Sequence, residues 1–396
     1  LEFAVRWLHV ITAIAWIGSS FYFIALDLGL HRDRNLPSGA DGEEWQVHGG
    51  GFYHIQKYLV APADMPDGLI WHKWQSYWTW ISGFALLVLV YYLGAEFYLI
   101  DPAVMDLAVW QAVAISVASL AFGWLVYNAL CKVFVNANQT GLMVALFGVL
   151  VVMAWGYTQV FSGRAALLHL GAFTATIMSA NVFMIIIPNQ KVVVADLIAG
   201  RKPDPIYGKI AKQRSTHNNY LTLPVLFLML SNHYPLAFAS EYNWIIASLV
   251  FLMGVTIRHF FNTMHQRKGM PWWTWAATAM LFIAIVGLST APLARDEAAV
   301  GDAAAARFAQ AEGFAEVEQI VVTRCSMCHA EQPAWQGLHW APKGVHLETP
   351  GQIAAQAREI HLQAGLSHAM PPANLSWMEE AERAAIRDWY AAATGG

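Results

Sequence analysis

The sequence predicts an all-α protein in two parts, a polytopic membrane bundle of about eight transmembrane helices followed by a small helical domain. Hydrophobic residues make up 57% of its 396 residues, and 18 are Trp, which is too apolar for a soluble fold of this length. Long apolar runs stop near residue 292, and a Cys-x-x-Cys-His motif follows in more polar sequence. We therefore assign 1–292 to the bundle, 293–306 to an Ala-rich linker and 307–396 to the C-terminal domain.

The bundle is predicted from apolar segments that reach the ~20 residues a helix needs to cross a bilayer. These segments are 3–26, 75–98, 108–130, 141–160, 165–188, 219–238, 243–265 and 272–292. Such a chain has membrane lipid as its surroundings, and no basic stripe typical of nucleic-acid binding is present.

The connections between these segments predict the orientation. Those after the first, third, fifth and seventh segments carry nearly all the Lys and Arg residues, whereas those after the second, fourth and sixth carry only Arg164. By the positive-inside rule, the odd connections are cytoplasmic and both termini are outside. We therefore expect a bacterial inner membrane protein with its C-terminal domain on the periplasmic side.

Two connections, 27–74 and 189–218, are too long to be simple turns. The first contains Gly49-Gly50-Gly51, which either lets the backbone approach a ligand closely or forms a flexible loop. The second leads into the polar stretch 213–220 at the start of the sixth segment. This stretch is interpreted as a hydrogen-bonding site, with a simple interfacial cap as the alternative.

Histidines at membrane depth are a second candidate site, because ionisable groups there are costly. His9 and His169 fall in the outer halves of the first and fifth segments. Each could simply bond to a neighbouring helix. As a facing pair they could ligate a haem b, which would carry electrons part of the way across the ~30 Å hydrocarbon core.

The motif Cys325-Ser326-Met327-Cys328-His329 is the C-x-x-C-H signature of covalent haem attachment. The two thiols bind the porphyrin vinyl groups, and His329 ligates the iron. A redox dithiol does not need the His, and the remaining cysteine, Cys131, is too few for a Cys-rich zinc site. Because C-x-x-C-H proteins receive haem outside the bacterial cytoplasm, this motif supports the predicted topology independently.

The elements around this motif predict a class I cytochrome c domain that holds haem c. A helix over 313–324 precedes the motif, and capping boxes at Thr349 and Ser376 begin two later helices. Met370, on a stiff Pro-Pro loop, is the predicted sixth iron ligand, with His361, His368 and Met378 as competitors.

Several stretches of the bundle resemble the bacterial membrane-bound urate hydroxylases (urate oxidases) that end in a cytochrome c. The matching stretches are Arg6-Trp7-Leu8-His9-Val10, Ile14-Ala15-Trp16-Ile17-Gly18, His48-Gly49-Gly50-Gly51-Phe52-Tyr53, Tyr77-Trp78-Thr79-Trp80-Ile81-Ser82-Gly83, His217-Asn218-Asn219-Tyr220-Leu221-Thr222-Leu223-Pro224 and Ile257-Arg258-His259-Phe260-Phe261-Asn262. The resemblance covers essentially the whole chain, including the order of the two parts.

This resemblance implies oxidation of urate to 5-hydroxyisourate, with electrons passing to the cytochrome and on to an external cytochrome or oxidase of the respiratory chain. Among the polar residues, Arg214 could pair with the urate anion. Asn218 could match its amide edge, and His217 or His259 could act as general base.

Two alternatives belong to other functional classes. One is a relay subunit that carries electrons from quinol to a cytochrome without urate chemistry, but it would not require the polar connections. The other is a transporter with a sensory cytochrome, for which the sequence shows no evident inverted repeat.

Overall fold

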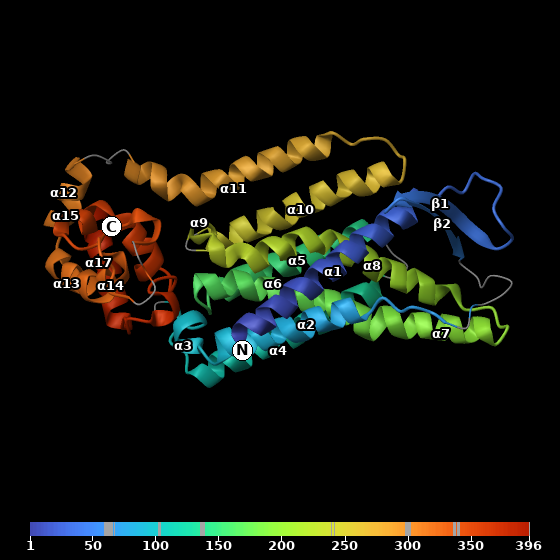
Figure 1. Ribbon diagram of the computed structural model, residues 1–396, viewed down its shortest axis with the longest axis horizontal. Helices are drawn as coiled ribbons and strands as arrows, with labels where there is room; N and C mark the ends of the chain where they lie inside the picture. Colours follow the sequence, from blue (N-terminus) through green and yellow to red (C-terminus); the bar gives the residue numbers. More distant parts are fainter. Residues whose placement is uncertain are drawn as a thin grey trace.

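The computed structural model describes the chain except residues 59–65, 67, 102–103, 135–138, 239, 241, 298–301, 336–337, 339–340 and 396. The predicted linker, 293–306, therefore lies partly outside the described residues. Antiparallel helices form an elongated bundle, and the C-terminal domain sits at one end of it (Figure 1). The predicted, mostly helical architecture is confirmed.

Most of the predicted apolar segments become long helices of the bundle. Its elements are α1 (Glu2–Gly29), α2 (Trp74–Leu86), η1 (Leu87–Tyr92), α3 (Ala95–Tyr98), α4 (Val109–Val133), α5 (Gln139–Thr158), α6 (Gly163–Ala180), η2 (Asn181–Ile186), α7 (Ile187–Ile198), α8 (Pro205–Leu230), η3 (Ser231–His233), α9 (Pro235–Phe238), α10 (Asn243–His265) and α11 (Trp273–Glu297).

Six helical stretches among the described residues are long and apolar enough to cross a membrane: Glu2–Gly29, Val109–Val133, Gln139–Thr158, Gly163–Ile198, Asn243–His265 and Trp273–Thr290. The other two predicted segments do not form single long apolar helices. Segment 75–98 is divided among α2, η1 and α3, and segment 219–238 shares α8 with the polar stretch that precedes it. The total of eight spans stays a prediction, while six candidate spans are consistent with membrane association.

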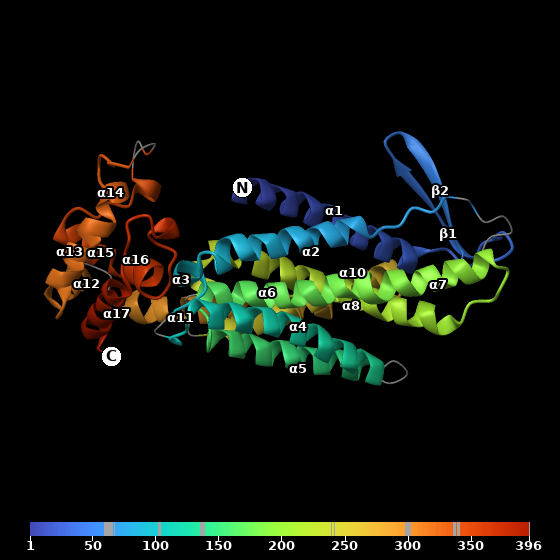
Figure 2. The same ribbon diagram turned by 90° about the horizontal axis from the view of Figure 1, so that it is seen from below.

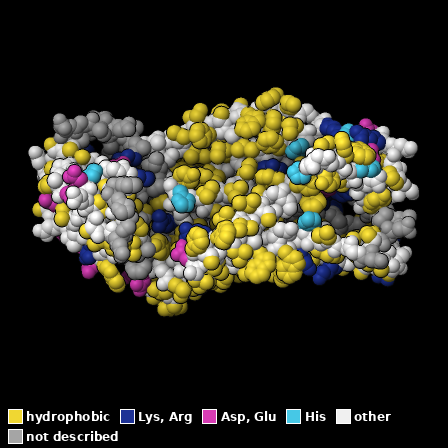
Figure 3. All heavy atoms as spheres, viewed as in Figure 1, with side chains coloured by type: hydrophobic (Ala, Val, Ile, Leu, Met, Phe, Trp, Pro, Cys, Tyr) yellow, Lys and Arg dark blue, Asp and Glu magenta, His cyan; other side chains and the backbone are white. Residues whose placement is uncertain are grey.

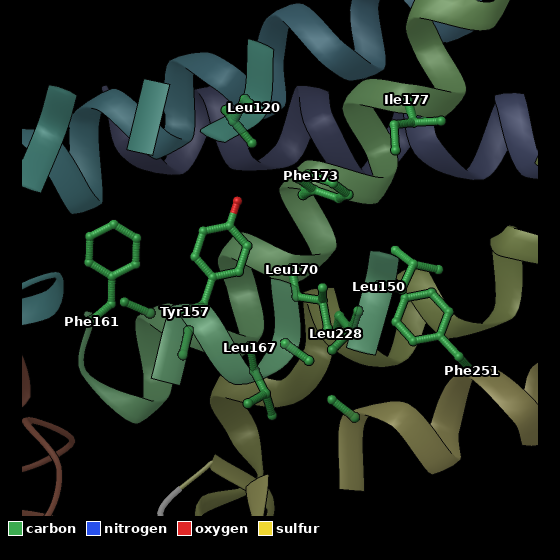
Figure 4. Close-up of a cluster of buried hydrophobic side chains, with 14 of the residues drawn as sticks. Leu120, Leu150, Tyr157, Phe161, Leu167, Leu170, Phe173, Ile177, Leu228 and Phe251 are labelled. Carbon is green, nitrogen blue, oxygen red and sulfur yellow. The ribbon is translucent and has the colours of Figure 1, made fainter. Parts of the chain in front are cut away.

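The bundle core lies between α4, α5, α6, α8 and α10. Tyr157, Phe173 and Phe251 are almost fully buried there, and Figure 4 shows their rings facing the same interior space as the surrounding leucines. Close helix approach needs small residues. A Cβ on Gly254 of α10 would lie 2.5 Å from Cδ of Pro224 in α8, so glycine at this position allows the two helices to pack.

The outside of the bundle is apolar as well. Ile14, Phe122, Leu125 and Ile283 are all more than half exposed. In Figure 3, hydrophobic side chains cover the middle of the molecule, while charged side chains and histidines gather toward its two ends. An apolar belt of this kind is what lipid contact requires.

The connection 27–74 contains the clearest departure from an all-helical protein. Strands β1 (Ala40–His48) and β2 (Gly51–Tyr58) form an antiparallel hairpin. Gly49 (φ +59°) and Gly50 (φ +81°) make its turn, where positive φ favours glycine. From the sequence, the glycine run is interpreted as a close approach to a ligand or as a flexible loop, and neither interpretation predicts a hairpin turn.

The two ends of the bundle carry different connections. The hairpin and the α7–α8 connection lie at one end, and α3, α9 and the C-terminal domain lie at the other (Figures 1 and 2). Odd and even connections therefore lie at opposite ends, as a polytopic chain requires.

The C-terminal domain is a set of short helices around its own core. They are α12 (Asp302–Gln310), α13 (Phe314–Arg324), α14 (Ser326–His329), η4 (Pro342–Gly344), α15 (Pro350–Ala355), α16 (Ala357–Ile360), η5 (His361–Gly365), η6 (Pro372–Asn374) and α17 (Glu380–Thr394). Val317, Ile353, Ile386 and Trp389 are fully buried between them.

The predicted helix starts in this domain are only partly right. The capping box at Thr349 is confirmed, since its side chain accepts from the Gln352 N–H. The prediction at Ser376 is wrong: Glu379 is the N-cap of α17, with Glu382 as its capping partner. The carbonyl of Ser376 instead accepts a hydrogen bond from Arg324.

Candidate functional site

The polar stretch of the sixth segment is helical, not a loop, because α8 already begins at Pro205 behind the N-cap Asp204. Arg214, His217 and Asn218 follow one another at helical spacing and share one face of α8. Their exposed fractions are 2%, 3% and 5%. The structure therefore brings three predicted site residues together inside the bundle.

Side chains of α4 and η2 complete this group, which we call the Arg214 network. Arg214 Nη1 donates to Asn181 Oδ1 (3.2 Å), and its Nη2 donates to Asn128 Oδ1 (2.7 Å). The Asn181 amide donates to Asn218 Oδ1 (2.9 Å) and to the Tyr127 hydroxyl (3.0 Å). Tyr127 OH and His217 Nδ1 are 2.8 Å apart, which links the histidine to the arginine.

The Arg214 guanidinium is a buried cation whose hydrogen-bond acceptors are neutral amides. Its Cζ also lies 4.9 Å from the centre of the Tyr127 ring and 5.9 Å from that of Trp124. None of the ion pairs made by the described residues includes Arg214, and its buried Nε has no partner among them. A buried charge without a counter-ion is costly, so this arrangement favours a bound anion.

A second polar group, the Arg258 cluster, lies between α8 and α10. It comprises Asn219, Arg258 and Asn262. Arg258 Nη2 donates to Asn262 Oδ1 (3.1 Å), and the Asn262 amide donates to Asn219 Oδ1 (2.9 Å). The Arg258 guanidinium covers the Phe21 ring at 4.1 Å.

His259 is not part of either group. Its Nδ1 lies 3.2 Å from the hydroxyl of Tyr220, and its ring is 5.9 Å from that of Trp273. Because residues 258 and 259 are about 100° apart on a helix, only Arg258 reaches the cluster. Of the two predicted general bases, the structure places His217, and not His259, beside Arg214.

The proposed haem b ligands do not form a haem site in this arrangement. His9 Nδ1 bonds to the Thr79 carbonyl (3.0 Å) and Ser82 Oγ (3.2 Å) of α2. His169 is fully buried, with Nδ1 at 2.8 Å from the Ala165 carbonyl and Nε2 at 2.8 Å from Ser116 Oγ. Both ring nitrogens of His169 are therefore engaged within the protein, and we derive no electron-transfer step through a haem b.

The haem c residues fit their predicted roles better. The end of α13 places Cys325 against the domain core, and Cys328 and His329 follow on α14. His329 Nδ1 lies 3.0 Å from the Val345 carbonyl, which orients the ring and leaves Nε2 for iron. Burial raises the pKa of the Cys325 thiol to about 12.

Met370 stays the predicted sixth ligand. Its side chain packs against the C-terminal core, and its carbonyl accepts from Arg383 Nη1 (2.9 Å). The competitors have other partners: His361 stacks on Tyr390 with ring centres 4.0 Å apart, and His368 Nε2 lies 3.5 Å from Glu380. Met378 is 3% exposed within the core.

The sequence reasoning missed Tyr127, Asn128 and Asn181, which hold the Arg214 network together. Asn128 and Asn181 are polar residues inside long apolar runs, and that signal could have identified them. Tyr127 is inconspicuous in an aromatic-rich bundle.

The fold and these groups define a polytopic helical protein with a buried cationic site and a separate C-terminal domain. The family model described as urate oxidase N-terminal matches residues 1–289, so the chain belongs to that family. Membership implies an oxidoreductase acting in urate-related oxidation. Comparison with curated proteins gave no match, and neither did comparison with solved structures.

Proposed function

We propose that the bundle binds the urate anion at the Arg214 network and hydroxylates it to 5-hydroxyisourate, with electrons passing to haem c in the C-terminal domain. The observation that carries this proposal is the buried Arg214 guanidinium, which has amide partners and an unpartnered Nε. Urate is an anion near neutral pH, so it would supply the missing negative charge.

The surrounding groups match the rest of the substrate. Asn181 and Asn218 offer amide donors and acceptors to the carbonyl and N–H edge of urate. The Tyr127 and Trp124 rings that flank Arg214 could stack on a flat heterocycle. The substrate would replace hydrogen bonds that the network now makes internally.

His217 is the proposed general base. In the tautomer in which its Nδ1–H donates to the Tyr127 oxygen, Nε2 has a free lone pair and can take a proton from the attacking water. Urate and water together give 5-hydroxyisourate, two protons and two electrons, so the balance requires an electron acceptor. Haem c, which Cys325, Cys328, His329 and Met370 would hold, would accept one electron at a time when bound, so the two electrons would leave in two sequential transfers.

From haem c the electrons would pass to an external cytochrome or oxidase. The C-terminal domain that would hold haem c lies at the end of the bundle away from the hairpin (Figure 1). We propose the bacterial inner membrane as the location, with this domain and both termini on the periplasmic side.

The test is urate turnover by Arg214→Lys, which keeps the charge but loses the planar fork. We expect kcat/KM to fall by roughly 100-fold, equivalent to about 2.7 kcal/mol. The control is Arg201→Lys, because Arg201 is an exposed arginine paired with Asp196. Equal activity of Arg214→Lys and wild type, with both proteins carrying haem c, would refute the assigned site.

A further inference from the structure

A cavity lies between α1, α10 and β1. These elements meet at the end of the bundle that carries the hairpin (Figure 1). The cavity volume is about 300 Å³, at the lower limit of small-molecule sites. Gly29 ends α1, His265 ends α10, and Glu44 and Gln46 both line the cavity from β1. We call it the hairpin cavity.

Two polar atoms of the hairpin cavity lack partners within the described part of the chain. They are Glu44 Oε2 and His265 Nδ1, and both are buried. A buried polar atom that is unsatisfied costs free energy, so two of them in one cavity indicate a polar occupant. Gly29 leaves room for the carboxylate, because a Cβ at this position would lie 3.1 Å from Glu44 Oε2.

The opposite charge is also present in this cavity. Arg267 is held in place by His31 Nδ1 (2.8 Å) and by the Gly29 carbonyl (2.9 Å). Arg267 is exposed and makes no ion pair among the described residues, although Asp33, which pairs with His31, is close enough to interact with its charge. The cavity thus combines a carboxylate that accepts hydrogen bonds with a guanidinium that donates them.

The hairpin cavity also adjoins the polar interior. Asn262 of the Arg258 cluster precedes the cavity residue His265 by one turn of α10. Phe21, whose ring contacts Arg258, precedes the cavity residue Tyr22 on α1. In the same way, Asn219 of the cluster follows Asn218 of the Arg214 network on α8. The Arg258 cluster therefore lies on α8 and α10, the two helices that also carry Arg214 and the cavity residue His265.

We propose that the hairpin cavity is an entry site that binds urate before it reaches the Arg214 network. The N–H edge of the ring faces Glu44, and a carbonyl edge faces Arg267. A cyclic ureide carries both kinds of edge on one flat molecule, which matches the pair of charges in the cavity. This assignment rests on the proposed function and adds a substrate-binding site to it.

The test is steady-state urate oxidation by the full-length, haem-loaded chain. Glu44→Leu removes the carboxylate at similar size, and we expect the KM for urate to rise about tenfold, with the loss falling on KM instead of kcat. Gly29→Ala narrows the cavity without removing a polar group, and we expect a smaller rise in KM. The matched control is Glu43→Gln, because Glu43 is the neighbouring carboxylate on the same strand and pairs with His54 outside the cavity.

Unchanged KM values in both Glu44→Leu and Gly29→Ala, with normal haem c spectra, would overturn the entry site. Gly29→Ala keeps the test decisive if Glu44→Leu fails to fold. A wild-type protein that does not oxidise urate would instead refute the proposed function and, with it, this assignment. Normal urate turnover by the wild type together with unaltered variants refutes the entry site alone.

Discussion

The bundle and the C-terminal domain each bury an arginine to the same extent, but they use it differently. Arg214 and Arg383 are both 2% exposed. Arg214 donates to side-chain amides, whereas Arg383 Nη1 donates to the backbone carbonyls of Ala364, Ser367 and Met370. Backbone carbonyls are fixed by the fold, while amide side chains can turn toward a ligand. Each arginine also has one buried nitrogen without a partner among the described residues, Nε of Arg214 and Nη2 of Arg383. The difference in acceptors is therefore what assigns Arg383 to structure and Arg214 to binding.

The largest effect on stability is expected from Arg383→Met. Three buried carbonyls would lose their donor, at a cost of about 3 kcal/mol or more. The Met370 loop would also lose an anchor, so the absorbance band of Met–iron ligation should weaken. Thermal melting followed by haem absorbance measures the loss of stability and the weakening of the Met–iron band.

Arg214→Met is the matched variant in the bundle. Two side-chain oxygens, Asn128 Oδ1 and Asn181 Oδ1, lose their donor, but the substitution also removes a buried charge that has no counter-ion. We therefore expect a stability cost of about 1 kcal/mol. Activity should nevertheless be lost. Equal destabilisation by the two substitutions, measured by tryptophan fluorescence on heating, would show that Arg214 is structural too.

A smaller effect is expected from the Glu380 carboxylate of the C-terminal domain, which pairs with His368 and Arg387. Burial acts to raise the pKa of Glu380, but hydrogen bonds from His368 and Arg387 outweigh it and hold the pKa below its ordinary value of 4.5. The stabilisation is therefore present above pH 4.5 and is lost as the pH falls through the lowered pKa.

Glu380→Gln should flatten this acid dependence, with an effect of less than about 1 kcal/mol because the carboxylate is partly exposed. Melting temperatures recorded from pH 6 down to pH 3, on the order of half a unit apart, measure the slope. Glu359→Gln, at an exposed pair with Arg358, is the control. If the slope of melting temperature against pH is unchanged in Glu380→Gln but altered in Glu359→Gln, Glu380 is not the source of the acid dependence.

The sequence predicted long apolar helices well because their periodicity and length come from local composition. The predicted segment 243–265 coincides with α10, and 108–130 lies within α4 except for its first residue. The hairpin was missed because the side chains of Trp45, Val47 and Phe52 are exposed, so no buried face produced a clear alternating pattern.

Predicting the site was harder, because it depends on contacts between distant segments. Arg214, His217 and Asn218 could be identified as one polar face. Their partners Asn128 and Asn181 come from other helices, and only tertiary packing shows that they meet. His259 is the alternative general base that follows from the resemblance, but helix geometry directs it toward Tyr220.

The central claim is that urate oxidation in the bundle delivers electrons to haem c. The most direct measurement is the visible spectrum of the purified, oxidised protein after anaerobic addition of urate. We predict the reduced c-haem band together with loss of urate absorbance, and neither change in Arg214→Met. A haem that stays oxidised with urate but is reduced by a quinol would contradict the account and favour an electron relay.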